Sequence, residues 1–147
     1  MYRPHPEAER RIKSATLMIK HILAGRSPDV LDAHIRELLD KMIWKITEAD
    51  GKNDTRYQSE VALSKPNGIR LQHEHVYQKK NMIDLLLRAK ADEIDKILAL
   101  ACGCCVTEQE HVRLSQFNSD YGWERYRKAG IVVIDGFTGK RLFEKEC

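Results

Sequence analysis

The sequence lacks any apolar run of membrane-spanning length. No stretch approaches the ~18 consecutive apolar residues that a transmembrane helix needs, and the first six residues do not open a hydrophobic signal segment. We therefore expect a cytoplasmic protein with no membrane partner. A Walker loop and a Gly-x-Gly-x-x-Gly motif are also missing, which argues against the usual nucleotide-binding folds.

Cysteine is scarce and poorly spaced for a disulfide framework. Three of the four cysteines are Cys102, Cys104 and Cys105, and the fourth is Cys147. A zinc site built from thiols would need a second Cys-x-x-Cys motif, which the sequence does not have. We expect reduced thiols that pack as small apolar side chains ahead of a strand.

An excess of charge of one sign is lacking as well. The chain has 25 Lys and Arg against 22 Asp and Glu, a net charge of +3, which by itself does not indicate nucleic-acid binding. At 147 residues, roughly two-thirds of the unfolded chain's surface is buried on folding. The chain can therefore form a core without disulfides or structural metals.

Two amphipathic helices are predicted within residues 1–50. Apolar residues recur every three or four positions from Glu7 to Ala24, and Gly25 is a natural helix end. Ser27-Pro28-Asp29 is typical of a helix start, so a second helix is predicted from there to about Thr47. The short link between the two indicates an antiparallel hairpin. Its apolar stripes are wider than one small neighbour would cover, which is typical of a homo-oligomer or of a protein that binds a partner.

Residues 51–147 form the second predicted unit, after the turn-rich segment that begins at Asp50. Residues 56–63 are interpreted as a short helix or strand. A strand is predicted from Ile69 to Val76, which would place His73 and His75 on one face and Glu74 on the other. A helix capped by Asn81 and a further helix from residue 91 should follow this strand.

The last third of the chain adds strands and short helices. Cys104-Cys105-Val106 is a predicted strand, and Thr107-Glu108-Gln109-Glu110 matches the capping box, which would place His111 in the first turn of a helix. A short helix over residues 122–128 and a β-hairpin over residues 131–143 complete the chain. The predicted class is α+β, with an N-terminal helical hairpin, a small mixed domain and a C-terminal β-hairpin.

Two segments resemble the HNH, or His-Me finger, nuclease family. These are Glu74-His75-Val76 at a strand end and Val106-Thr107 leading to His111 at a helix start. The resemblance implies a ββα-metal core in which Glu74 and His111 bind a divalent cation, Mg²⁺, Mn²⁺ or Zn²⁺. It also implies that His75 is the general base, with His73 as a second catalytic imidazole beside it. Ser115 stands where many family members have a second histidine on the helix.

A nucleic-acid substrate, DNA more than RNA, is what this resemblance implies. Basic residues that could hold phosphates are Lys79, Lys80, Arg125, Arg127 and Lys128, and the last three share a segment with two aromatic residues. Three interpretations stay open. The chain could be a metal-dependent endonuclease, a nuclease-derived fold that binds without cutting, or an interaction protein, dimeric through its N-terminal helices, whose histidines satisfy hydrogen bonds in the core.

Overall fold

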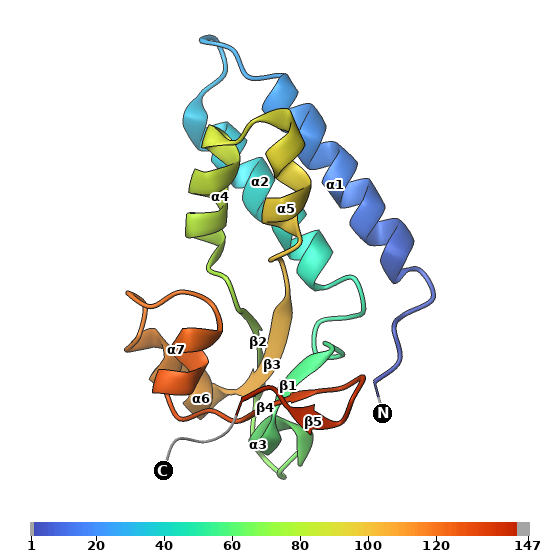
Figure 1. The fold of residues 1–147 in the computed structure, drawn as a ribbon, viewed down its shortest axis with the longest axis vertical. Helices are drawn as coiled ribbons and strands as arrows, with labels where there is room; N and C mark the ends of the chain where they lie inside the picture. Colours follow the sequence, from blue (N-terminus) through green and yellow to red (C-terminus); the bar gives the residue numbers. More distant parts are fainter. Residues whose placement is uncertain (1, 144–147) are drawn as a thin grey trace.

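The computed structural model describes residues 2–143, which divide into a helical end and a sheet end (Figure 1). The helical end contains α1 (Ala8–Ala24), α2 (Asp32–Thr47), α4 (Lys79–Arg88), the 3-10 turn η1 (Ala91–Glu93) and α5 (Ile94–Leu98). The sheet end contains five strands together with α3 (Glu60–Leu63), α6 (Glu108–Ser115) and α7 (Trp123–Lys128). The α+β class is confirmed, with the helical hairpin first and a strand pair last. None of the described helices is long and apolar enough to cross a membrane.

One mixed sheet joins all the described strands. They are β1 (Tyr57–Ser59), β2 (Leu71–His75), β3 (Gly103–Thr107), β4 (Val133–Asp135) and β5 (Lys140–Arg141). Their order is β2-β3-β1-β4-β5, with β1 parallel to β3 and the other pairs antiparallel. Because α6 follows β3 directly, the chain forms two antiparallel strands and a helix at the place where the resemblance implied a ββα unit.

Each end of the molecule has its own apolar cluster. The first lies among α1, α2, α4 and α5, and includes the fully buried Ile19, Leu39, Ile43 and Met82. The second lies between the sheet and helices α6 and α7, around Tyr126. Tyr77 packs against both clusters. The helical hairpin therefore belongs to the same folded body as the sheet.

The start of α6 is fixed by a capping box, as the sequence predicts. The Thr107 hydroxyl accepts the backbone N–H of Glu110 at 3.2 Å, and a Glu110 carboxylate oxygen accepts the backbone N–H of Thr107 at 2.9 Å. The same carboxylate oxygen accepts the Ser59 hydroxyl at 2.6 Å. These bonds satisfy backbone N–H groups at the helix start that have no partner within the helix, and they connect the first turn to β1. They set the position of His111 one residue later.

Three local predictions are corrected by the structure. The second helix starts at Asp32 and not at Ser27, because the Ser27 carbonyl accepts the Val30 N–H in a turn and Leu31 is extended. Helix α4 starts at Lys79 after Gln78, so Asn81 lies inside the helix and does not cap it. Residues 56–63 contain both a strand and a helix, because Ser59 ends β1 and its hydroxyl accepts the Ala62 N–H at 3.0 Å.

Gly103 is required for the packing of His73 against β3. A Cβ atom at position 103 would lie 2.4 Å from Cε1 and 2.7 Å from Nε2 of the His73 ring, and hydrogen bonds on both ring nitrogens hold that ring in place. We expect Gly103→Ala to lower the free energy of unfolding by about 1–3 kcal/mol, measured by urea denaturation. In a His73→Ala background the same change should cost much less. An equal cost in both backgrounds would show that the contact with His73 is not the reason for glycine.

Candidate functional site

The alternation of side chains along β2 separates the residues that the resemblance would bring together. Glu74 contacts His111 of α6 and Arg125 of α7. His73 and His75 contact Thr47 of α2 instead. Since successive side chains of a strand point to opposite faces, the expected opposition of Glu74 and His75 is confirmed. The structure brings Glu74 and His111 together and does not bring His75 to them.

The carboxylate of Glu74 is held by one guanidinium and one imidazole. Its Oε2 accepts a hydrogen bond from Nη2 of Arg125 at 2.6 Å, and its Oε1 contacts Nδ1 of His111. The Arg125 side chain is buried, that of Glu74 is nearly so, and that of His111 is half exposed. An ionised carboxylate only accepts hydrogen bonds, so Nδ1 of His111 is the donor and its Nε2 is left for another partner. Arg125 thus supplies positive charge where the resemblance implies a divalent cation.

Two side chains in this region can serve as metal ligands. Glu74 and His111 are adjacent, and within residues 2–143 no group of three or more His, Cys, Asp or Glu side chains is arranged to hold a metal ion. Protein sites for catalytic zinc commonly supply three ligands. Magnesium is often bound through one or two carboxylates together with substrate phosphates, so the Glu74–His111 pair on its own fits only such a minimal site.

The opposite face of β2 holds a chain of hydrogen bonds centred on Thr47. The carbonyl of Lys52 lies 2.7 Å from Nδ1 of His73, and a carbonyl only accepts, so this nitrogen carries a proton. Nε2 of a neutral His73 then accepts from the Thr47 hydroxyl at 3.2 Å, and the hydroxyl oxygen accepts Nε2–H of His75 at 3.0 Å. The Trp44 carbonyl, 3.3 Å from the Thr47 hydroxyl oxygen, is a second acceptor for the same hydroxyl proton. The histidines join β2 to the end of α2.

Burial keeps both of these histidines neutral. It lowers the pKa of His75 from 6.5 to about 3, and the nearby His73, Lys79 and Arg125 act in the same direction. Burial also lowers the pKa of His73, against the raising effect of its bond to the Lys52 carbonyl. The Trp44 ring lies against both, with ring centroids 5.0 Å from His73 and 4.4 Å from His75. Their contacts are those of core histidines.

Four of the five predicted phosphate-binding residues pair with carboxylates of this chain. Lys79 lies 2.9 Å from Asp40 and over the Trp44 ring. Arg125 is buried against Glu74. Two further pairs complete the set, Arg127 with Glu124 at 2.9 Å and Lys128 with Asp120 at 2.6 Å. Lys80 is exposed in the first turn of α4. Intramolecular carboxylates therefore offset most of the positive charge of this set.

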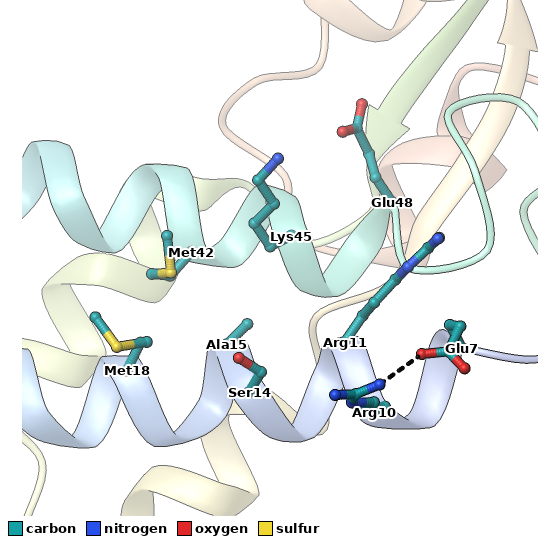
Figure 2. Close-up of a pocket in the computed structure, with 9 residues that line it drawn as sticks. All are labelled: Glu7, Arg10, Arg11, Ser14, Ala15, Met18, Met42, Lys45 and Glu48. Atoms are coloured by element: carbon teal, nitrogen blue, oxygen red, sulfur yellow. Dashed lines mark hydrogen bonds and ion pairs between the residues drawn. The ribbon is translucent and has the colours of Figure 1, made fainter.

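A groove of about 610 Å³ between α1 and α2 is a second candidate site. Met18, Met42 and Ala15 are its apolar residues, and Figure 2 shows the two methionines facing each other from the two helices. Charged and polar side chains surround them. These are Glu7, Arg10, Arg11, Ser14, Lys45 and Glu48.

Sequence reasoning missed the partners of the predicted site residues. Thr47 and Trp44 lie more than 25 positions before the histidines that they contact, and Arg125 lies 51 positions after Glu74. No local pattern encodes such pairs. The sequence did indicate the groove, because Met18 and Met42 belong to apolar stripes that are wider than the hairpin itself can bury.

Removal of Arg125 should destabilise the protein strongly. Arg125→Met leaves the Glu74 carboxylate largely buried without its guanidinium, and losing one partner of a buried pair costs about 3–5 kcal/mol. Urea denaturation at neutral pH measures this cost. Adding Glu74→Gln to Arg125→Met should recover part of it. Arg127→Met, which breaks a more exposed pair on the same helix, should cost no more than about 1 kcal/mol. Similar costs for the two arginine variants would refute a buried role for Arg125.

Stability should fall as the solution becomes acidic. The folded-state pKa of His75, about 3, lies below its ordinary value of 6.5, so the unfolded chain binds more protons between these two values. The stabilisation is complete above pH 6.5, and acidification toward pH 3 removes an amount on the order of a few kcal/mol. Urea denaturation at several pH values measures the slope.

The pH slope can be assigned to His75 with a matched pair of variants. His75→Phe should reduce the slope, and a residual slope should remain because the pKa of His73 is lowered too. His34→Ala, at an exposed position on α2, should leave it unchanged. A slope that survives intact in His75→Phe would mean that His75 titrates normally in the folded protein.

Comparison of the chain with protein-family models, with curated protein sequences and with solved structures finds no match. The nuclease resemblance therefore depends on the quoted residues alone. The function has to be argued from the geometry of this chain.

Proposed function

We propose that this protein is a non-catalytic binding module whose α1–α2 hairpin binds another protein, with the sheet end as its support. The observation that supports this most strongly is the division of functional groups by β2. Glu74 is held by Arg125 and His111 on one face, and His75 is neutral and hydrogen-bonded to Thr47 on the other. Metal-assisted hydrolysis needs the cation and the base to act on one water and one phosphate.

The cost of converting this arrangement into a catalytic one is large. A cation between Glu74 and His111 would lie beside the guanidinium of Arg125, so Arg125 would have to leave a buried carboxylate partner. His75 would have to leave the Thr47 hydroxyl and the Trp44 ring and turn to the other face of the strand. Both changes would break contacts that stabilise the core.

The hairpin has the features of a protein-binding surface. Six of the thirteen large apolar side chains that are exposed in the described chain lie between Ile12 and Leu38. The groove combines apolar side chains with charges of both signs, whereas a nucleic-acid surface is predominantly basic. Exposed apolar residues with a charged rim mark protein interaction sites. This surface fits a protein partner better than a phosphate backbone.

Metal-dependent hydrolysis of nucleic-acid phosphodiesters is the second candidate. It is favoured by one observation, the adjacency of Glu74 and His111 at the start of α6 with the His111 ring half exposed. Under this candidate the two residues would bind a divalent cation that polarises the phosphate. His75 would act as the base only after it had left Thr47.

Incubation with nucleic acid separates the two candidates. Supercoiled plasmid and single-stranded RNA are each incubated with the purified protein and Mg²⁺, Mn²⁺ or Zn²⁺, alongside His75→Ala and His111→Ala. We expect intact substrates in every reaction, because the candidate metal ligand His111 and the candidate base His75 lie on opposite faces of β2. Metal-dependent cleavage by the natural sequence that is lost in His111→Ala would overturn the non-catalytic proposal.

A further inference from the structure

We infer that the occupant of the α1–α2 groove is a second copy of this chain, bound about a two-fold axis so that the two hairpins form a four-helix arrangement. This inference rests on the proposed function, in which the hairpin is a protein-binding surface. It adds the identity of the partner and the residues that meet across the contact.

The groove runs over residues that the rest of the described chain covers only in part, since Ala15 belongs to the first cluster and Met42 packs against it, whereas Met18 is exposed. Helices α4 and α5 supply the apolar residues that pack with α1 and α2 in the first cluster. Met18 and Leu38 stay about half exposed, at 47% and 46%. Leu38, Met42 and Lys45 follow one another at four- and three-residue spacing, so they lie along one face of α2. The apolar surface of the groove therefore continues along α2 beyond Met42.

The charges around the groove are self-complementary. Arg10, Arg11 and Lys45 are positive, and Glu7 and Glu48 are negative. A partner of one sign would meet like charge somewhere on this rim. A second copy brings both signs, because a two-fold axis that sets Lys45 opposite the partner's Glu48 also sets Glu48 opposite the partner's Lys45. Complementary rim charges of this kind select a partner and fix its register.

The shape and chemistry of the groove suit helices as the occupant. Figure 2 shows Met18 and Met42 facing each other between the two antiparallel helices, with Lys45, Glu48 and Arg11 at one end. Methionine side chains are flexible and adapt to irregular apolar surfaces. Two antiparallel hairpins joined along such a seam have the packing of a four-helix bundle. The contact would cover the exposed Met18 and Leu38 of both copies.

Sedimentation velocity over a range of protein concentrations tests the inference on the full chain. The natural sequence should form a dimer, and Met18→Glu should weaken dimerisation at least about tenfold, because it places a charge in the apolar part of the contact. Val112→Glu is the matched control, since Val112 is 55% exposed on α6 at the sheet end, and it should leave the dimer intact. A natural sequence that stays monomeric at roughly 1 mM would overturn the inference, as would equal weakening by the two variants.

Charge reversal tests the pairing across the axis. Lys45→Glu and Glu48→Lys should each weaken the dimer, because each sets like charges against each other twice. The double variant restores opposite charges and should recover most of the affinity. A double variant as weak as the single ones would overturn the pairing. Circular dichroism of each variant checks that the helices remain folded.

The failure of self-association can be told apart from the failure of the proposed function. A strict monomer that leaves plasmid and RNA intact overturns the second copy as partner and keeps the non-catalytic proposal. Metal-dependent cleavage that requires His111 overturns the proposed function whatever the oligomeric state.

Discussion

The alternation of side chains along β2 determines where the polar groups of this chain lie. One five-residue strand directs Glu74 to the helices of the sheet end and His73 and His75 to the end of α2. In a regular strand without a bulge, a residue moves to the other face only if its neighbours along the strand are reversed as well. The strand therefore joins the two ends of the molecule and at the same time keeps its acidic and basic groups apart.

On each face of β2 the charged and imidazole groups pair with other groups of the chain, although Nε of the buried Arg125 has no hydrogen-bond partner among the described residues. On one face the buried Arg125 neutralises Glu74 and leaves His111 as the exposed member of the group. On the other face a single threonine hydroxyl bridges two neutral histidines, and Gly103 leaves room for one of their rings. Buried polar groups are costly unless they are paired. Residue types that elsewhere bind metals and move protons can in this chain stabilise the fold.

Much of the fold follows from local patterns in the sequence, and little of the candidate site does. The apolar stripes predicted α1 and α2, the capping box predicted the start of α6, and the alternation from Ile69 to Val76 predicted β2 and the opposite orientation of Glu74 and His75. The resemblance implied that Glu74 and His111 lie together, and the two side chains are in contact. The pairing of Arg125 with Glu74 could not be predicted, because 51 residues separate them and only the packing of α7 on the sheet joins them. The pairing of Lys79 with Asp40, 39 residues apart, could not be predicted for the same reason. Arg127 and Lys128 pair instead with carboxylates close to them in the sequence.

Because they lie on opposite faces of β2, His75 and His111 should not share a cation. Nuclear magnetic resonance of isotope-labelled histidine rings during a titration with Mn²⁺ tests it most directly, because a bound paramagnetic ion broadens the signals of nearby nuclei. We expect the His75 ring to stay neutral, protonated on Nε2, and to keep sharp signals at Mn²⁺ concentrations that broaden the signals of exposed rings. Parallel broadening of the His75 and His111 rings at low Mn²⁺ concentration would instead show that one cation lies between them.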